Sequence, residues 1–323
     1  MTATRHIAYG SPQRLLVAKV PVPDVGVDDV LVRVHAASVN PLDAKLVAGE
    51  PYLVRMVNGL IGPRNARLGV DFAGRVEEVG RGVTTFAPGD EVFGCGKGAF
   101  AEYVVVPAGK ALLAKPPALG FDQAAAVPIA GLTALQALRD AARLRVGQRV
   151  LVNGAAGGVG TFAVQIAKAL GAEVTGVCST GNVDLVQSIG ADSVIDYTRT
   201  DFVTSARPYD VIVDMAGNRT LANLRRALVP KGTLVSVGAH EMGNWIAPIT
   251  GPFKLVATSP FVGRSLRPFL ARQRREDLAA LVEFLAAGTV VPVIGRKYPL
   301  SEVRAAIAHV ATGHARGKVV VIA

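Results

Sequence analysis

Cysteine is scarce in this chain of 323 residues, which contains only Cys95 and Cys178. These two residues lie far apart, so they form no cluster with the spacing of metal ligands. No apolar run is long enough to cross a bilayer, although half of the residues are apolar. The N-terminal segment also lacks the charged and then apolar pattern of a secretion signal. Together these absences predict a reducing, cytoplasmic setting.

Acidic residues are outnumbered, since 35 Lys and Arg stand against 25 Asp and Glu and give a formal net charge of +10. A surface rich in arginine is one explanation, and an anionic ligand or partner is the other. No internal repeat or low-complexity tract is visible. The length therefore fits two globular domains, each able to bury a core of its own.

A complete strand–turn–helix–strand unit stands near the middle of the sequence. Arg149–Asn153 is a short apolar run typical of a buried strand, and Glu173–Cys178 is a second one. Between them Gly154, Gly157 and Gly160 recur at three-residue spacing and open a helix. A glycine turn lets the backbone approach a pyrophosphate, and the helix N-terminus offers free N–H groups and a positive dipole end. This context predicts a dinucleotide site, whereas a tight turn without a ligand is the plainer alternative.

Two patterns follow one another along the chain, and the fold class they predict is α/β. Residues 1–121 alternate short apolar runs with Pro and Gly, which is typical of β structure. From residue 149 strands and helices alternate, which predicts a doubly wound parallel sheet. The expected strands are Val30–Val34, Ala101–Val106, Arg149–Asn153, Glu173–Cys178, Ser193–Asp196, Tyr209–Asp214, Gly232–Val237 and Val319–Ile322. The expected helices are Gly160–Leu170, Asn182–Ile189, Leu221–Leu228 and Arg264–Ala287, with an Ala-rich helical region at Gln123–Ala142.

Several short motifs resemble the medium-chain dehydrogenase/reductase superfamily, in its zinc-independent quinone oxidoreductase branch. They are Ala37–Asp43, Gly69–Gly74, Pro88–Val92, Gly131–Ala134, Gly154–Gly160, Gly190–Asp192 with Asp196 and Tyr197, and Gly317–Val320. The resemblance implies a GroES-like, mainly β catalytic domain made of residues 1–121 and 263–323. A Rossmann domain of residues 122–262 would be inserted into it, with the cofactor in the cleft between them. Members of this family are commonly homodimers.

Zinc ligands are missing where zinc-dependent members of the superfamily have them. Those members carry a Cys in the first motif and a His-Glu pair in the second, whereas this chain has Asn40 and Asp43, and then Asp71 and Phe72. We therefore predict no metal. Without a Lewis acid, oxidation of a simple alcohol loses its usual means of stabilising an alkoxide. Quinones and α,β-unsaturated carbonyls are the favoured substrates, because their carbon is already electrophilic.

The segment after the second Rossmann strand bears on the choice of cofactor. NAD-binding folds usually place an Asp or Glu there, but the first acid along the chain is Asp184, inside the next helix. A 2′-phosphate would thus meet no repulsion, and it could accept hydrogen bonds from Ser179, Thr180 and Asn182. This pattern favours NADPH.

One departure weakens the expected preference for NADPH. Related sequences often place a Lys or Arg in this segment, where this chain has Gly181. By resemblance Tyr197 lies near the adenosine phosphate, and Arg199 could supply the missing charge. An ordinary surface pair at a strand end is the alternative for these two residues.

The remaining cofactor contacts are implied by the resemblance. Asn40 and Thr133 match positions beside the nicotinamide half. The alternatives are an Asx turn before Pro41, which is compatible with that role, and a Thr bonded to its own helix backbone. Lys318 could reach a phosphate, or it could be a solvated lysine. Backbone groups of the turn and of two strand-end loops complete the expected set, namely Gly158, Val159, Ala216, Gly217, Val237, Gly238 and Ala239.

The reaction we expect is hydride transfer to an electrophilic carbon, which needs a proton donor near the carbonyl oxygen. Tyr52 is the candidate donor, or it packs locally as a loop aromatic. Asp43 and Lys45 could assist proton transfer, or they could form a structural ion pair. Substrate contacts are expected from residues 52–68 and 242–262. In the second range Phe253 and Phe261 would form an apolar wall, unless they belong to the core.

Two other functions remain open. One is a zinc-free alcohol dehydrogenase or a polyketide-type enoyl reductase. The other is a non-catalytic NADPH-binding protein that touches nucleic acid through a basic run. The run comprises Arg264, Arg267, Arg272, Arg274 and Arg275. Since acidic residues follow it and only Phe269 could stack on a base, a solvated helix face is the more economical interpretation.

Overall fold

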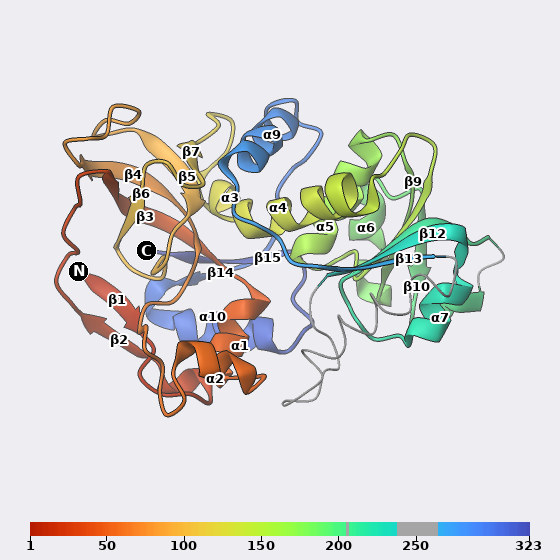
Figure 1. Ribbon diagram of the computed structural model, residues 1–323, viewed down its shortest axis with the longest axis horizontal. Helices are drawn as coiled ribbons and strands as arrows, with labels where there is room; N and C mark the ends of the chain where they lie inside the picture. The colour runs from red at the N-terminus through yellow and green to blue at the C-terminus, as the bar shows by residue number, and fades with distance from the viewer. Residues whose placement is uncertain (205–206, 238–263) are drawn as a thin grey trace. The chain divides into compact units, whose positions relative to one another are not determined.

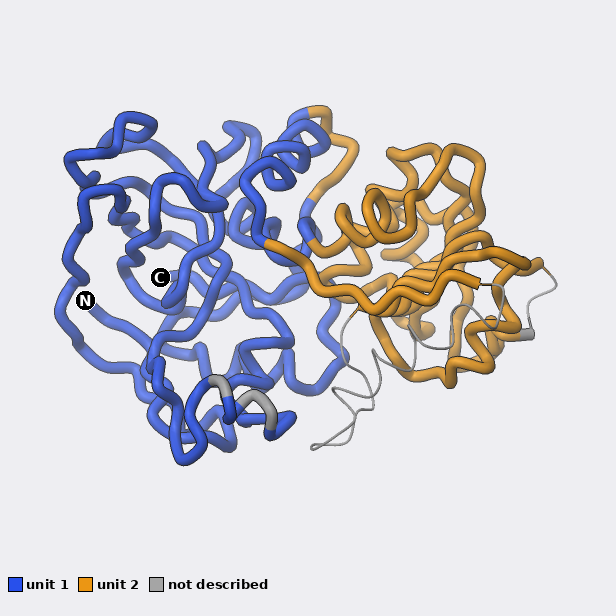
Figure 2. Tube along the Cα trace, viewed as in Figure 1, with its two compact units in different colours: residues 1–132, 273–286, 292–323 blue, residues 133–272, 287–291 orange. Residues whose placement is uncertain are grey.

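The computed structural model describes residues 1–204, 207–237 and 264–323, and the chain divides into two compact units (Figure 1, Figure 2). Both ends of the chain contribute to unit 1. The sequence places the domain limits at 121/122 and 262/263, somewhat before the points at which the units divide. Unit 1 comprises Met1–Leu132, Gln273–Ala286 and Pro292–Ala323, and unit 2 comprises Thr133–Arg272 and Ala287–Val291.

Unit 1 is built on a mixed sheet with the strand order β14-β15-β3-β4-β5-β7, and β6 pairs with β3. Its central strand β3 buries apolar side chains along most of its length. The core lies between this sheet and α10, whose Val303 and Ile307 are buried. The strands are β1 Thr2–Arg5, β2 Leu16–Lys19, β3 Asp29–Val39, β4 Asp71–Val79, β5 Glu91–Cys95, β6 Tyr103–Pro107, β7 Leu112–Ala114, β14 Ile294–Pro299 and β15 Lys318–Ile322. The helices are α1 Pro41–Ala48, α2 Leu53–Asn58, α3 Phe121–Ala125, α4 Pro128–Gln136, which runs on into unit 2, α9 Arg275–Ala286 and α10 Val303–Ala311.

Unit 2 contains a wholly parallel sheet with the order β10-β9-β8-β11-β12-β13. Counted along the chain this order is 3-2-1-4-5-6, the arrangement of a Rossmann fold. The strand order therefore reverses between β8 and β11, and ligands of such sheets bind at the carboxyl ends of the strands at that point. The strands are β8 Arg149–Asn153, β9 Glu173–Cys178, β10 Ser193–Asp196, β11 Tyr209–Asp214, β12 Leu228–Val237 and β13 Ser265–Phe269. The helices are α5 Gly158–Ala169, α6 Val183–Ser188 and α7 Leu221–Arg226, and Ala137–Ala142 is a π-helix.

The predicted strands β8 to β11 are confirmed at their expected limits, and the helices of unit 2 start and end within three residues of theirs. The α5 helix ends where expected because Gly171, at φ +79°, adopts the left-handed conformation that stops a helix. Among the described residues, no helix is long and apolar enough to cross a membrane.

The predicted helix Arg264–Ala287 is wrong in its first half. Ser265–Phe269 instead adds a sixth strand to the sheet, parallel to β12, and the helix starts only at Arg275. Pro268 disfavours a helix interior and is tolerated in an edge strand. Three arginines of the basic run donate hydrogen bonds to backbone carbonyls. Arg264 donates to Leu228, Arg267 to Ala141, and Arg275 to Ala108 and Leu112. These contacts give the three residues a structural role.

Candidate functional site

The glycine turn of unit 2 follows β8 at the point where the strand order reverses. Gly154 has φ +89°, a conformation that favours glycine, and a Cβ on Gly160 would lie 2.1 Å from the carbonyl oxygen of Gly154. A Cβ on Gly157 would instead approach only that same oxygen, at 3.4 Å. Gly154 and Gly160 thus shape the turn, whereas Gly157 leaves open space in front of α5. The first N–H groups of a helix lack partners within it, so the turn fits a bound pyrophosphate.

The loop after β11 is fastened to the end of β8, across the point where the strand order reverses. The side-chain amide of Asn153 donates to the carboxylate of Asp214 at 2.8 Å and to Asn218 Oδ1 at 3.0 Å. The backbone N–H of Gly217 donates to the same Asp214 oxygen at 3.0 Å. The loop that carries Ala216 and Gly217 is therefore held beside the glycine turn. Asn153 and Asp214 were not predicted as site residues, because a polar residue at a strand end carries no signal of its own.

An acid from the neighbouring strand β10 lies beside the end of β9. Asp196 ends β10, pairs with Cys178 in the parallel register, and accepts a hydrogen bond from Thr180 Oγ1 at 2.6 Å. The expectation that a phosphate would meet no negative charge here is therefore wrong. The Thr180 hydrogen bond, together with Thr198 and Arg199, lowers the pKa of Asp196, and Arg199 Nε lies 3.5 Å from the carboxylate.

The other predicted residues at this strand end lie in the same neighbourhood. Asn182 donates to Ser179 Oγ at 3.0 Å, and the backbone N–H of Tyr197 donates to the carbonyl of Cys178 at 3.0 Å. The Tyr197 side chain is exposed. Hydroxyl, amide, phenol and guanidinium groups are thus gathered around the end of β9.

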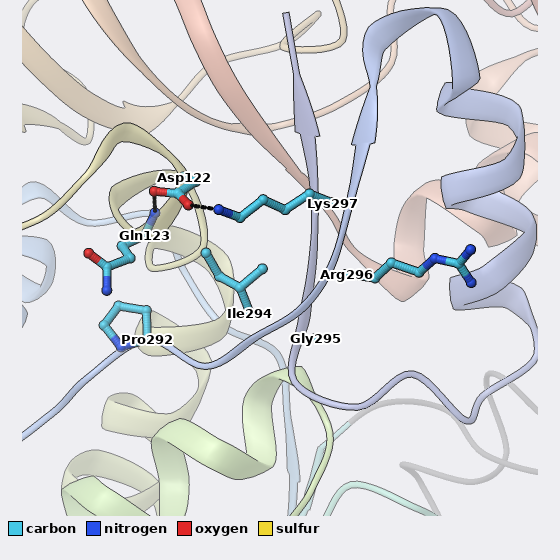
Figure 3. A pocket seen from close by; sticks show the side chains of 7 residues that line it. All are labelled: Asp122, Gln123, Pro292, Ile294, Gly295, Arg296 and Lys297. Atoms are coloured by element: carbon cyan, nitrogen blue, oxygen red, sulfur yellow. Dashed lines mark hydrogen bonds and ion pairs between the residues drawn. The ribbon is translucent and has the colours of Figure 1, made fainter.

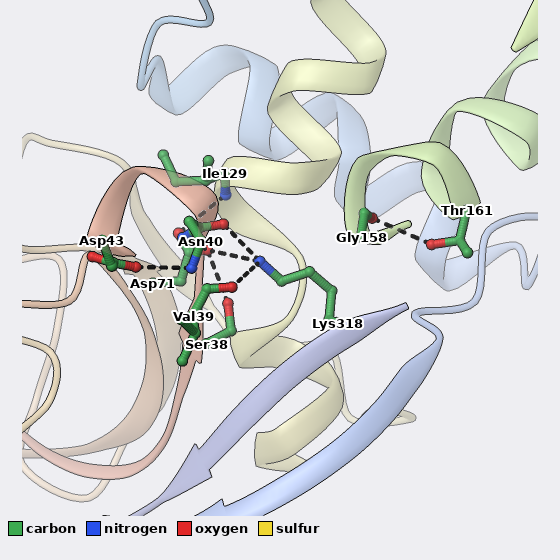
Figure 4. A network of polar contacts seen from close by, with 9 residues as sticks. All are labelled: Ser38, Val39, Asn40, Asp43, Asp71, Ile129, Gly158, Thr161 and Lys318. Carbon is green, nitrogen blue, oxygen red and sulfur yellow. Dashed lines mark hydrogen bonds and ion pairs between the residues drawn. The ribbon is translucent and has the colours of Figure 1, made fainter. Parts of the chain in front are cut away.

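A buried polar network lies in unit 1, where α1 follows β3 (Figure 4). The Asp71 carboxylate accepts hydrogen bonds from Ser38 Oγ and Asn40 Nδ2, both at 2.9 Å, and from the backbone N–H of Ile129 at 3.1 Å. Lys318 Nζ donates to Asn40 Oδ1 at 2.7 Å and to the Val39 carbonyl at 3.4 Å.

Lys318 also forms an ion pair with Asp71, with 3.6 Å between Nζ and Oδ2. Its side chain is 3% exposed and that of Asp71 is fully buried. The ammonium of Lys318 is therefore engaged inside unit 1, which does not favour the expected contact with a phosphate. Asn40 has both ends of its amide held in place, because its oxygen accepts from Lys318 and its nitrogen donates to Asp71.

Asp43 is the second buried carboxyl of this region. It accepts a hydrogen bond from the backbone N–H of Asn40 at 2.8 Å and so caps the first turn of α1. Burial raises the pKa of Asp43 to about 7, and the neighbouring charge of Asp71 adds to this while the Asn40 hydrogen bond and Lys318 oppose it. A carboxyl with a pKa near 7 can hold a proton at neutral pH.

The remaining predicted residues are spread over both units. Tyr52 comes just before α2, and the Arg55 guanidinium lies 4.8 Å from its ring centroid. Burial lowers the pKa of Lys45, which is on α1. Thr133 is buried in α4, and Val237 ends β12. Outside the described residues lie the predicted Gly238, Ala239, Phe253 and Phe261, and the whole range 242–262.

A cavity of about 470 Å³ in unit 1 coincides with none of the predicted site residues (Figure 3). It is lined by α3 and by residues 292–297, and Lys297 and Asp122 form an ion pair there. The Asp122 carboxylate also accepts a hydrogen bond from the Gln123 backbone N–H at 2.9 Å, and the Arg296 side chain points away from this pair. Its charged lining gives no reason to place an apolar quinone in it.

Comparison with known proteins shows the family. Two family models match, one described as an alcohol dehydrogenase GroES-like domain over residues 26–117 and one as a zinc-binding dehydrogenase over residues 189–321. The chain is 34% identical to the chloroplast envelope quinone oxidoreductase homolog of Arabidopsis thaliana, over 99% of this chain and 98% of that protein. The chain belongs to the medium-chain dehydrogenase/reductase superfamily. It is thus an oxidoreductase of that superfamily, as its motifs predict.

Two further members of the superfamily resemble this medium-chain oxidoreductase closely. It is 36% identical to the trans-enoyl reductase pgmF of Aspergillus terreus, over 93% of this chain and 89% of that protein. The structure of the Escherichia coli quinone oxidoreductase complexed with NADPH matches it with a TM-score of 0.84 at 26% identity, over 100% of both chains.

The residues of this oxidoreductase do not fit the zinc ion that one of the matching models names. Around Asp71 the side chains that contact it are an amide, a hydroxyl and the Lys318 ammonium, which neutralises the carboxylate and takes the place of a cation. Burial also raises the pKa of the Cys95 thiol well above its usual value, which disfavours the thiolate that a zinc ion requires. Within residues 1–204, 207–237 and 264–323 no three His, Cys, Asp or Glu side chains are grouped to hold a metal.

Proposed function

We propose that this chain is an NADPH-dependent reductase of quinones or α,β-unsaturated carbonyls that works without zinc. The observation that carries the proposal is the glycine turn Gly154–Gly160, which stands where the order of the parallel strands reverses. The relatives named as quinone oxidoreductase and trans-enoyl reductase support the substrate class. The quinone oxidoreductase solved with NADPH supports the cofactor.

The cofactor-binding residues of the proposal follow the carboxyl ends of β8, β9, β10 and β11. Gly157 and the N-terminus of α5 would hold the pyrophosphate, and backbone groups of Ala216 and Gly217 would contact the nicotinamide half. Thr180 and Arg199 would bind the 2′-phosphate. Because Asp196 already engages both side chains, we expect NADPH to be preferred over NADH only modestly.

NADPH, when bound, supplies a hydride to the electrophilic carbon, and the protein must then stabilise charge on the carbonyl oxygen. We assign the Tyr52 hydroxyl to donate a hydrogen bond to that oxygen. Asp43 would hold the proton that follows, because burial brings its pKa to about 7. The amide of Asn40, fixed by Lys318 and Asp71, would present an N–H to the nicotinamide half.

We propose a cytoplasmic homodimer as the working form. Both cysteines are free and buried, which suits a reducing compartment. Relatives are named from chloroplasts and from mitochondria, so the compartment rests on the sequence alone. Light scattering on the eluting peak of a sizing column would test the dimer.

A panel of acceptors tests the reaction class. Purified protein should oxidise NADPH when a quinone or an enone is added, and should not oxidise a saturated alcohol with NADP⁺. Turnover of the alcohol would favour the dehydrogenase alternative, and activity on a thioester enone alone would favour the enoyl reductase. Tight NADPH binding without turnover of any acceptor would leave a non-catalytic binding protein.

A further inference from the structure

A second cavity lies in unit 2, at the edge of the parallel sheet opposite the glycine turn. It measures about 450 Å³ and is lined by the starts of β11, β12 and β13 and by the segment after the π-helix Ala137–Ala142. The glycine turn follows the carboxyl end of β8, and this cavity lies at the amino end of the same strand. Five residues of β8 therefore separate them, on the order of 17 Å at 3.3 Å per residue.

Positive charge dominates the lining of this cavity. Arg143, Arg145, Lys231 and Arg267 line it, against the single acid Asp210. The Asp210 carboxylate is itself occupied, because it accepts a hydrogen bond from the backbone N–H of Arg149 at 2.8 Å and lies 3.9 Å from the Arg149 Nε. Four of the lining residues therefore carry a positive charge with little compensation.

The guanidinium of Arg267 is held in a fixed direction. Its Nε donates to Ser265 Oγ at 2.9 Å and its Nη1 donates to the Ala141 carbonyl at 2.8 Å. A guanidinium has five N–H hydrogens, so at least two remain for a ligand. An arginine whose rotamer is already fixed loses little entropy when it binds an anion.

Unusual backbone conformations occur at the same cavity, which is an observation independent of its charge. Arg143 at φ +53° and Lys231 at φ +64° are the non-glycine residues of the described chain with positive φ, and both line it. Arg143 is the C-cap of the π-helix, a position usually given to Gly or Asn. Long cationic side chains are thus kept at two positions where glycine would be less strained, and such outliers cluster at binding sites.

We propose that this cavity binds a small anion with two adjacent phosphoryl groups, of the pyrophosphate type. Its volume is in the range of small-molecule sites, about 300–1,000 Å³, and arginine forks bind phosphoryl oxygens in pairs. Among the described residues that line it none is aromatic, so these residues offer no surface on which a base could stack. The lining therefore favours a small ligand over RNA.

Calorimetric titration of inorganic pyrophosphate into the full-length protein tests this site. NADPH is present in excess so that the glycine turn is filled, and the ionic strength is kept constant at a physiological value. We expect saturable binding to one site, tighter than that of inorganic phosphate. Arg267→Gln should weaken it at least about tenfold, as expected for lost hydrogen bonds between charged groups. Arg226→Gln, which removes an exposed arginine of α7 outside the cavity, should leave it unchanged.

A second variant keeps the test independent of folding. Lys231→Gly should weaken pyrophosphate binding without lowering the melting temperature of the ligand-free protein, because glycine accepts the positive φ. Absence of saturable binding would overturn the proposal, as would equal weakening by Arg226→Gln and Arg267→Gln. Binding of polyuridylate in place of pyrophosphate, lost with Arg267→Gln, would overturn it in favour of RNA.

Discussion

Among individual residues, Lys318 and Asp71 form a buried ion pair that links the C-terminal strand to the N-terminal part of unit 1. Lys318 opens β15, yet its ammonium reaches the carboxylate of β4 and the amide of Asn40. Each of these three polar groups would be costly to bury alone. Together they fix the start of α1, where the candidate proton donor Asp43 lies.

Lys318→Met should destabilise the protein by about 3–5 kcal/mol, because it leaves the Asp71 carboxylate buried without its cation. Urea denaturation would measure the loss. The matched control is Lys297→Met, which breaks the more exposed ion pair with Asp122 and should cost less than about 1 kcal/mol. Equal losses in the two variants would refute a special role for the buried pair.

Asp43→Asn should change how stability depends on pH. The folded-state pKa of Asp43 is raised from 3.8 to about 7, so the folded protein holds a proton there that the unfolded chain releases above pH 4. The wild type therefore loses stability at this group as the pH rises from about 4 to 7, and the Asn variant does not. Urea denaturation at pH 5 and pH 8 would measure this. The midpoint of the variant relative to that of the wild type should be higher at pH 8 than at pH 5.

Asp192→Asn provides the control of opposite sign. Burial alone would raise the pKa of Asp192, but hydrogen bonds from Lys168 and the Val174 N–H lower it below 3.8. That carboxylate therefore stabilises the folded state above pH 4, and its contribution is lost as the pH falls through its folded pKa. The same pH dependence in both variants would contradict the assignment for Asp43.

Helices and strands were predictable where one pattern dominated. The strands β8 to β11 are short apolar runs bounded by turn residues, and their limits could be read directly. The strand β13 could not, because Ser265–Phe269 carries two polar residues and a proline and gains its conformation from pairing with β12. The position of Asp196 beside the end of β9 was not predictable for a similar reason, since only the parallel register places it next to Cys178.

Two glycines of the turn before α5 should respond differently to substitution. Gly160→Ala places a methyl group against the carbonyl oxygen of Gly154 and should destabilise the fold. A Cβ on Gly157 makes only ordinary contact with the protein, and its φ of −79° is one that any residue adopts. Gly157→Val should therefore fold normally and crowd the pyrophosphate instead. We expect Gly157→Val to keep its melting temperature and lose NADPH affinity in a fluorescence titration. Unchanged affinity would refute the placement of the phosphate.

The residues that follow β9 and β10 should determine the preference for NADPH over NADH. Arg199→Ala should raise the KM for NADPH about tenfold, because a hydrogen-bonded charge beside the 2′-phosphate is lost. The KM for NADH should not change. Arg226→Ala, which removes an exposed arginine from α7, is the control and should affect neither cofactor. If Arg199→Ala raised both KM values equally, Arg199 would have no role in distinguishing them.

At the scale of the whole molecule, a Rossmann unit is inserted into a GroES-like unit made from both ends of the chain. The resemblance of the motifs to the superfamily predicted this architecture, because periodicity alone could not assign residues 263–323 to the first domain. The contacts within the catalytic unit were not predictable, since Asn40, Asp71 and Lys318 are up to 278 positions apart along the chain. Only folding brings their side chains together.

The most direct test of the account is the rate of NADPH oxidation with and without a quinone, after dialysis against a metal chelator. We predict no oxidation without an acceptor, rapid oxidation when the quinone is added, and the same rate before and after chelation. NADH in the same assay should support the reaction less well. A rate that disappears on chelation, or NADPH that binds tightly but is oxidised by no quinone or enone, would contradict the account.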